Sequence, residues 1–169
     1  MLSATKLAAL LPSKKIGETL YVFDELASTN AFAMEIAKNQ ALSETIILSD
    51  RQTAGRGRLD RSWFSPGKSN IYGSLLFVQE ATIQYLGWIP LMAGVAIAQA
   101  LQQQTGIRIN LKWPNDLLIG GHKLGGVLCD SFRNPEHQTC VVIGFGINVN
   151  LSQPEFPLEL QTSATSLQI

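Results

Sequence analysis

The sequence predicts a single α+β domain in which helices pack on a mixed, largely antiparallel β-sheet. Segments with strand character outnumber those with helical periodicity. Gly120-Gly121 separates two apolar runs, which is typical of the two-residue turn of an antiparallel hairpin. The 169 residues, 46% of them hydrophobic, are enough for one core and too few for two ordinary domains.

The first half of the chain alternates helices with strands. Apolar residues at helical spacing predict a short amphipathic helix, and β-branched or aromatic runs predict strands. Ser28, Thr29 and Asn30 form an N-cap cluster that opens the second helix. The expected elements are a helix over Leu2–Leu11, a strand over Thr19–Leu26, a helix over Ala31–Asn39, and strands over Thr45–Ser49 and Asn70–Val78.

The second half begins with a long helix over Gln84–Thr105, which Gly106 ends, and we expect Trp88 and Met92 to be core residues on it. Alternating or glycine-interrupted apolar runs follow. They predict strands over Ile107–Trp113, Leu117–Ile119, Lys123–Cys129 and Val141–Asn150. The proline-interrupted tail, residues 151–169, shows no clear period, so we expect it to be weakly anchored and partly flexible or truncated.

Bulk composition limits the classes of function. With 13 basic and 13 acidic residues the formal net charge is +0, which argues against general binding to DNA or to an anionic membrane. No apolar run reaches the roughly 20 residues of a membrane span. Cys129 and Cys140 lack metal-site spacing, and two buried thiols are favoured over a disulfide across a hairpin. We expect a soluble, cytoplasmic protein.

The segment Asp50–Tyr72, called the arginine loop below, is the strongest polar feature. It combines four arginines with glycines and a proline that disfavour regular structure. Guanidinium groups grip carboxylates and phosphates through paired hydrogen bonds, and glycines let a ligand approach the backbone. The sequence therefore predicts an anion-binding loop that becomes ordered around its ligand.

A second polar constellation runs from Lys112 to Asp116 and continues at Lys123. Pro114-Asn115-Asp116 after a strand places a carboxamide and a carboxylate at a sheet edge, which suits Mg²⁺ or a nucleotide. Ordinary turn chemistry explains the same three residues equally well, and Lys123 is either an anion ligand or a free surface lysine.

The sequence contains no arrangement for nucleophilic catalysis, no metal-ligand spacing for its two histidines, and no Walker-type phosphate loop. Aligning two bound anions and neutralising their charge requires no nucleophilic side chain. Adenylation of a carboxylate is a reaction of that kind.

Five ordered motifs resemble those of the biotin protein ligases, over residues 20 to 150. They are Ser28-Thr29-Asn30, Gln52-Thr53-Ala54-Gly55-Arg56-Gly57-Arg58 with Arg61 and Trp63-Phe64-Ser65-Pro66, Lys112-Trp113-Pro114-Asn115-Asp116, Lys123-Leu124-Gly125-Gly126, and Gly144-Phe145-Gly146-Ile147-Asn148. The resemblance implies a fold related to class II aminoacyl-tRNA synthetases and a ligase that makes biotinyl-5′-AMP from biotin and MgATP. It implies transfer of biotin to a carrier-protein lysine, such as that of acetyl-CoA carboxylase.

The resemblance also implies roles for individual residues. Biotin would be bound by Ser28, Thr29, Asn30, Gln52, Gly55, Arg56, Gly57, Arg58, Lys123 and Gly126. ATP would be bound by Arg58, Arg61, Trp63, Lys112, Asn115, Asp116 and Asn148, with Asp116 as a magnesium ligand. Arg58 and Lys123 would be the catalytic residues.

The chain departs from the family pattern at both ends. It carries no N-terminal winged helix, so we expect a monofunctional ligase without DNA-binding repressor activity. It stops at Ile169, where family members continue into a small C-terminal domain. The alternatives are a lipoate or octanoate transferase or ligase of the same fold, and a non-catalytic biotin-binding module. Homodimerisation is left open.

Overall fold

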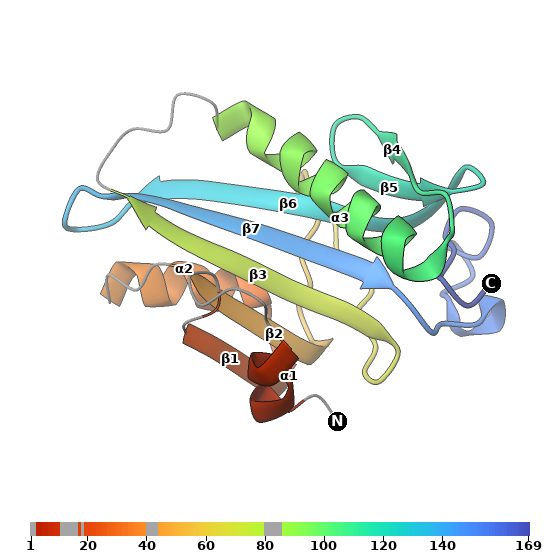
Figure 1. Cartoon of the computed structure of the whole chain (residues 1–169), viewed down its shortest axis with the longest axis horizontal. Helices are drawn as coiled ribbons and strands as arrows, with labels where there is room; N and C mark the ends of the chain where they lie inside the picture. Colours follow the sequence, from red (N-terminus) through yellow and green to blue (C-terminus); the bar gives the residue numbers. More distant parts are fainter. Residues whose placement is uncertain (1–2, 11–16, 18, 40–43, 80–85) are drawn as a thin grey trace.

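The computed structural model describes residues 3–10, 17, 19–39, 44–79 and 86–169. Seven strands form one sheet in the order β1-β2-β3-β7-β6-β5-β4 (Figure 1). They are β1 (Thr19–Leu26), β2 (Thr45–Gln52), β3 (Asn70–Gln79), β4 (Asn110–Lys112), β5 (Asp116–Ile119), β6 (His122–Arg133) and β7 (Thr139–Asn148). Only β1 and β2 pair in parallel, which confirms the prediction of a mixed, largely antiparallel sheet.

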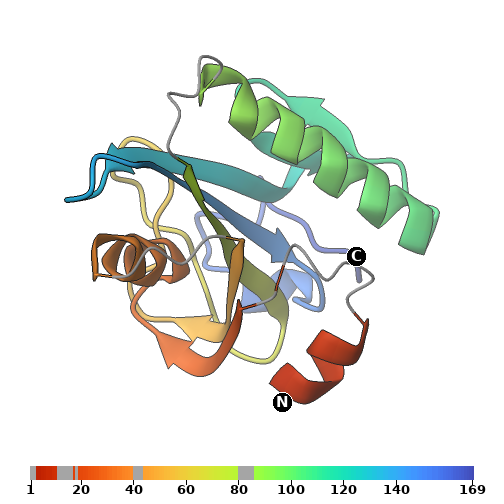
Figure 2. The same ribbon diagram turned by 60° about the vertical axis from the view of Figure 1, so that its left-hand side comes forward.

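The helices α2 (Thr29–Asn39) and α3 (Ile89–Thr105) cover opposite faces of the sheet (Figure 2). Alternation along β7 shows why. Cys140 and Val142 belong to the core under α2, whereas Ile143 and Ile147 belong to the core under α3. Successive side chains of a strand point to opposite faces, so the one apolar strand supplies both cores.

Several predicted boundaries agree with the structure. Gly106 ends α3 with a left-handed backbone (φ 72°), and Gly120 and Gly121 have the positive φ values that their hairpin turn requires. The short helix α1 (Ala4–Leu10) lies within the predicted Leu2–Leu11, whose end residues are outside the described ranges. The 3₁₀ turns η1 (Leu86–Trp88) and η2 (Gln153–Glu155) complete the elements.

Three predictions about the second half are wrong. Trp88 and Met92 are 61% and 66% exposed rather than in the core, because the small residues Gly94 and Ala98 form the buried side of α3. The strand predicted over Ile107–Trp113 is limited to β4, because its partner β5 is only four residues long. The helix predicted to begin at Gln84 starts at Ile89, since Leu86–Trp88 form a 3₁₀ turn. Residues 84 and 85 lie outside the described ranges.

The tail was expected to be weakly anchored, and its contacts correct that expectation. Leu151, Phe156 and Ala164 form a small buried cluster. Ala164 forms a parallel β-bridge with Lys123, whose N–H donates to the carbonyl of Ser163 over 2.8 Å. The tail therefore lies beside the start of β6 and hydrogen-bonds both the N–H and the carbonyl of Lys123.

Both cysteines are free thiols, as favoured from the sequence, and burial raises the pKa of each. For Cys129, burial and then the charge of Asp130 raise the pKa from 9.0 to about 12. Three pKa units mean an approximately thousandfold smaller thiolate population near pH 8. We therefore expect a thiol reagent such as DTNB to label both cysteines far faster in the unfolded protein than in the folded one. Equal labelling rates would contradict the assigned burial.

The pKa shift of Cys129 also predicts a pH dependence of stability. Because the folded-state pKa lies above the unfolded value, the stabilising contribution is complete below pH 9 and is lost as pH rises towards 12. The free energy of unfolding should therefore fall over that alkaline range, and Cys129→Ser should flatten the decline. Denaturant titrations at a series of pH values measure both effects.

Candidate functional site

Every predicted site residue except Gly55 lines one cavity of about 480 Å³. The cavity lies on the α2 face of the sheet, between the N-terminus of α2, the arginine loop, the β4–β5 turn and the tail. Its volume falls within the usual range of small-molecule sites. Gly55 lies behind the cavity wall, where an added Cβ would come within 2.6 Å of Ser65 Oγ and Trp63 O. It allows the loop to fold tightly rather than offering a surface to a ligand.

Glycines on β7 create the floor of the cavity. Gly144 is registered between Ser74 of β3 and Leu128 of β6, and Gly146 between Tyr72 and Gly126. Residues directly opposite one another on antiparallel strands share a face, so each row has a glycine at its centre. The two glycines leave room for Asn30 and Trp63, respectively.

This packing predicts that Gly144→Ala strongly impairs ligand binding. A Cβ at position 144 would collide with the carboxamide of Asn30, which is fixed by its own hydrogen bonds. We expect a loss of at least about tenfold in affinity for the ligand at the cavity floor, because a 1 Å displacement of a positioning group has effects of that order or larger. Isothermal titration calorimetry measures it. Gly87→Ala is the matched control, since nothing lies within 4 Å of an added Cβ there and Gly87 does not line the cavity.

Polar side chains at the N-terminus of α2 form the floor of the cavity. Ser28 caps the helix through a contact with the N–H of Ala31, and Thr29 N–H donates to Gln52 Oε1 over 2.8 Å. Asn30 Nδ2 donates to the carbonyl of Leu128 and to Asp130 Oδ2. Ser28, Thr29 and Asn30 are each no more than 5% exposed, so this is a buried polar floor with defined partners.

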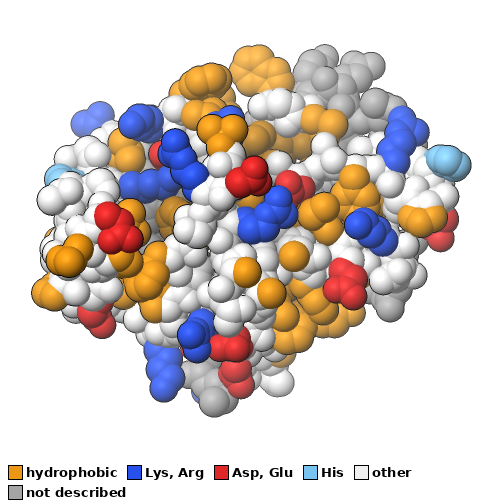
Figure 3. Space-filling view, turned by 180° about the vertical axis from the view of Figure 1, so that it is seen from behind, with side chains coloured by type: hydrophobic (Ala, Val, Ile, Leu, Met, Phe, Trp, Pro, Cys, Tyr) orange, Lys and Arg blue, Asp and Glu red, His pale blue; other side chains and the backbone are white. Residues whose placement is uncertain are grey.

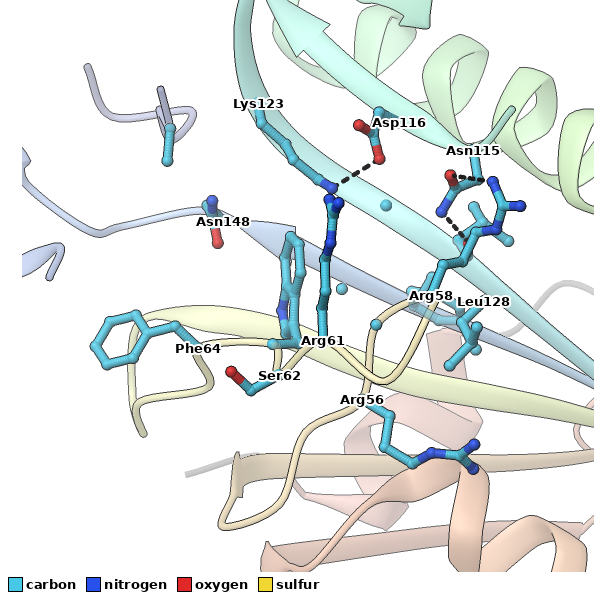
Figure 4. Close-up of a pocket in the computed structure, with 18 of the residues that line it drawn as sticks. Arg56, Arg58, Arg61, Ser62, Phe64, Asn115, Asp116, Lys123, Leu128 and Asn148 are labelled. Atoms are coloured by element: carbon cyan, nitrogen blue, oxygen red, sulfur yellow. Dashed lines mark hydrogen bonds and ion pairs between the residues drawn. The ribbon is translucent and has the colours of Figure 1, made fainter. Parts of the chain in front are cut away.

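The arginine loop folds into a small hairpin over the cavity. An isolated bridge pairs Arg56 with Ser62, and the N–H of Arg61 donates to the carbonyl of Arg58. Leu59 and Asp60, at the tip, have φ values of 55° and 57°, the pattern of a type I′ turn. The turn places Arg58 and Arg61 at its two ends, and Figure 4 shows both reaching toward Lys123, Asp116 and Asn115.

The far end of the loop is anchored at the start of β3. Tyr72 is buried, accepts a hydrogen bond from Asn70 Nδ2 and donates to the carbonyl of Pro66 over 3.0 Å. Burial raises the pKa of Tyr72, so the phenol stays protonated and remains a donor. The start of the loop is also regular, because Asp50, Arg51 and Gln52 extend β2 beyond the predicted Ser49.

The opposite wall carries the second constellation. Asn115 Nδ2 donates to the carbonyl of Val127, which holds the β4–β5 turn against β6, and Arg58 reaches Asn115 Oδ1 at 3.5 Å. Lys123 Nζ lies 2.7 Å from Asp116 Oδ1 and 5.4 Å from the centre of the Trp63 ring. Lys123 is therefore held by an ion pair and an aromatic face inside the cavity rather than free at the surface.

Basic side chains dominate the cavity although the whole chain has no net charge. Figure 3 shows lysine and arginine side chains gathered on the face opposite α3, towards the end that holds β4 and β5 in Figure 1. Five basic side chains and one acidic side chain line the cavity: Arg56, Arg58, Arg61, Lys112, Lys123 and Asp116. Such a concentration of positive charge in a concave site attracts carboxylates and phosphates.

Asn148 lines the cavity and also forms a hydrogen bond with the tail. It is buried at the end of β7, and its Nδ2 donates to the carbonyl of Thr165 over 3.0 Å. The amide therefore ties the tail to the sheet, and Phe156, Leu160 and Ala164 of the tail complete the cavity wall. The resemblance of Asn148 and the following tail to the family's adenine-covering segment predicted such a contribution, although the tail was expected to be weakly anchored.

Two residues that the sequence did not single out belong to the buried network. Ser74 Oγ lies 2.6 Å from Asn30 Oδ1 and 2.8 Å from Thr29 Oγ1, and Asp130 contacts both Asn30 and Arg56. Each is a polar residue on an otherwise apolar strand face. Alternation along β3 and β6 was the only available signal, and without the strand register it names no partner.

A metal ion would need ligands beyond the protein at this site. Within the described ranges, no group of three or more His, Cys, Asp or Glu residues lies close enough together to hold an ion. Among the described residues, Asp116 is the one carboxylate at the cavity wall. Mg²⁺ in nucleotide sites is commonly held by one or two carboxylates together with substrate phosphates. The donor set therefore fits Mg²⁺ only when it arrives with a polyphosphate.

None of the helices described is long and apolar enough to cross a membrane.

Comparison with known proteins places these residues in a family context. Residues 22–148 match the model of the biotin/lipoate A/B protein ligase family. The bifunctional ligase/repressor BirA of Bacillus subtilis is 38% identical over 166 residues, which are 98% of this chain and 51% of that protein. The biotin–[acetyl-CoA-carboxylase] ligase of Mycobacterium tuberculosis is 34% identical over 88% of this chain and 54% of its own length.

A solved structure has a similar fold. The biotin protein ligase of Aquifex aeolicus in complex with biotin and ATP superposes with a TM-score of 0.73 and 33% identity, over 89% of this chain and 60% of that chain. The chain thus spans about half the length of the curated relatives and three-fifths of this structural neighbour.

Proposed function

The chain belongs to the biotin/lipoate A/B protein ligase family, and on that premise we propose that it is a biotin protein ligase. It would join biotin to AMP and pass the biotinyl group to a lysine of a biotin carboxyl carrier domain. The observation that carries the proposal is a single cavity that combines a buried polar floor with five basic side chains. The floor suits a ureido ring, and the basic side chains suit a carboxylate and a triphosphate.

In the first half-reaction a carboxylate oxygen of biotin attacks the α-phosphorus of ATP. A new oxygen–phosphorus bond forms, the bond to the β-phosphate breaks, and pyrophosphate leaves. Both reactants are anions, so the main requirement is alignment and charge neutralisation. Arg58 and Lys123 would stabilise the reacting carboxylate and α-phosphate, with Arg61 and Lys112 on the remaining phosphates.

Ser28, Thr29, Asn30 and Gln52 would hold the biotin ring at the floor. Gly57, Arg56 and Gly126 would lie along the ligand, and Trp63, Asn115 and Asn148 would border the nucleotide. Asp116 would share Mg²⁺ with the phosphates, and the ion would supply further neutralisation of their charge. Lys123, which forms an ion pair with Asp116 in this structure, would then turn to the substrate anion.

In the second half-reaction the neutral amine of the carrier lysine attacks the acyl carbon of biotinyl-5′-AMP. An amide forms, AMP leaves, and the amine gives up its proton. A carrier domain of acetyl-CoA carboxylase is the proposed acceptor, because relatives are named for that substrate. The two free thiols support a cytoplasmic setting. The zero net charge argues against general binding of this chain to DNA, and homodimerisation stays open.

Mass spectrometry of a carrier domain tests this function. After incubation with the chain, biotin and MgATP, the carrier should gain the mass of one biotinyl group, and a carrier whose acceptor lysine is replaced by arginine should not. Addition of lipoate in place of biotin should give no product. Biotin binding without any mass gain would favour the non-catalytic module, and a lipoyl gain would favour the lipoate branch.

A further inference from the structure

We propose that Ser74 and Asp130, which do not line the cavity, are positioning residues that orient Thr29 and Asn30 so that the floor accepts hydrogen bonds from ligand N–H groups. The inference rests on the proposed function, and it adds a physical basis for selecting a ureido ring. It starts from the hydrogen bonds that link these four side chains.

Asp130 determines which way the Asn30 carboxamide points. Asn30 has one end 3.0 Å from Asp130 Oδ2 and 3.3 Å from the carbonyl of Leu128. An ionised carboxylate and a carbonyl can only accept hydrogen bonds, so the NH₂ group must occupy that end. The carboxamide oxygen consequently faces Ser74, at 2.6 Å.

The direction of the remaining bonds then follows. Ser74 Oγ carries one proton and lies near both Asn30 Oδ1 and Thr29 Oγ1. Because the carboxamide oxygen cannot donate, the Ser74 proton is committed to Asn30. The 2.8 Å contact between the two hydroxyls is therefore a hydrogen bond in which Thr29 donates to Ser74.

Thr29 is thereby left as an acceptor toward the cavity that it lines. Its proton is used by Ser74, and its 3.2 Å contact to Gln52 Oε1 is longer than an ordinary hydroxyl hydrogen bond. Gln52 Oε1 already accepts from the backbone N–H of Thr29. Because the Ser74 proton is directed to Asn30, no group in the described part of the chain donates to Thr29 Oγ1, so its free lone pairs match a ligand N–H.

Asp130 also connects this floor with the arginine loop. The same oxygen that accepts from Asn30 lies 3.7 Å from Arg56 Nη1, and Figure 4 shows Arg56 pointing away from Arg58 and Arg61. The Ser74 side chain is fully buried, and Asp130 is 22% exposed. One carboxylate thus holds an amide of α2 and a guanidinium of the loop against β6.

This arrangement favours a ring with N–H donors over a ring without them. A ureido nitrogen supplies the missing proton to Thr29, whereas a dithiolane ring or an N-alkylated ureido ring leaves the buried acceptor unpaired. Sites built to hydrogen-bond a polar group reject analogues that lack it by large factors. Ser74 and Asp130 would therefore influence specificity without touching the ligand.

The test measures affinities for two ligands by calorimetry: biotin, and biotin methylated on both ureido nitrogens. We expect Ser74→Ala to weaken biotin binding roughly tenfold to a hundredfold, because Asn30 can then reorient and the Thr29 proton is released toward the cavity. Affinity for the methylated ligand should stay nearly unchanged, so discrimination between the two collapses. Asp130→Ala should act in the same direction. Ser131 is an exposed serine on β6, next to Asp130, and Ser131→Ala should behave as the unaltered chain.

Two further variants guard against a simple folding defect. Ser74→Cys keeps nearly the same shape but offers a weak donor, and it should give an intermediate loss of discrimination. Thr29→Val removes the acceptor directly, so adding Ser74→Ala to it should cost little more. Equal weakening of both ligands, fully additive losses, or unchanged biotin affinity in Ser74→Ala would overturn the inference while leaving the proposed function intact. Absence of biotin binding by the unaltered chain would overturn both.

Discussion

Replacing Lys123 with alanine is expected to slow biotin-dependent pyrophosphate release by about a hundredfold or more, the usual cost of removing one preorganised electrostatic contact. The ammonium group is preorganised in two ways. Its backbone is fixed by hydrogen bonds to Ser163 and Thr165, and its side chain lies between Asp116 and the Trp63 ring. Alanine would also leave the Asp116 charge unpaired at the phosphate site, where it would repel the substrate.

A coupled pyrophosphate assay under saturating biotin and MgATP measures this effect. Lys38→Ala is the matched control, because Lys38 lies at the end of α2 over the Phe132 ring and does not line the cavity. Circular dichroism should show that both variants keep the fold. Undiminished pyrophosphate release from the Lys123 variant would remove that residue from the mechanism.

The second large effect is expected at Arg58, where alanine should lower the rate of adenylate formation by about a hundredfold and let biotinyl-5′-AMP escape. Arg58 stands at the start of the loop turn and reaches across the cavity to Asn115. Its loss would remove both a charge that neutralises the α-phosphate and a contact that holds the loop over the mixed anhydride.

Chromatographic separation of free from protein-bound biotinyl-5′-AMP measures the escape. Arg51→Ala provides the control, since Arg51 belongs to the same segment but pairs with Glu25 of β1, and both side chains are more than half exposed. Unchanged rate and unchanged retention in the Arg58 variant would show that the loop acts without this guanidinium.

The fold was predictable where local signals are strong. The Gly120-Gly121 hairpin and the Gly106 helix end follow from backbone conformations that glycine adopts readily. The face of α3 was not predictable. Its 17 residues contain no charge, so periodicity does not mark the buried side, and the sheet covers Gly94 and Ala98 while leaving Trp88 and Met92 exposed.

The candidate site was also predictable only in part. The predicted site residues other than Gly55 gather in one cavity, but the turn that aligns Arg58 with Arg61 has Leu59 and Asp60 at positive φ. Asp tolerates that conformation, whereas Leu rarely adopts it, so the sequence did not indicate this turn. The positions of Ser74 and Asp130 at the site follow from strand register, and the position of the tail follows from its long-range pairing with Lys123. Features of this kind arise from tertiary structure, which local sequence patterns do not encode.

The most direct test of the central claim is to mix the 169-residue chain with Mg²⁺, biotin and ATP labelled at the α-phosphate, and to quantify labelled biotinyl-5′-AMP. Biotin methyl ester, which lacks the attacking carboxylate, serves as the control. We predict that labelled adenylate appears together with an equal amount of pyrophosphate from biotin and not from the ester. Binding of both substrates without formation of adenylate would contradict the account.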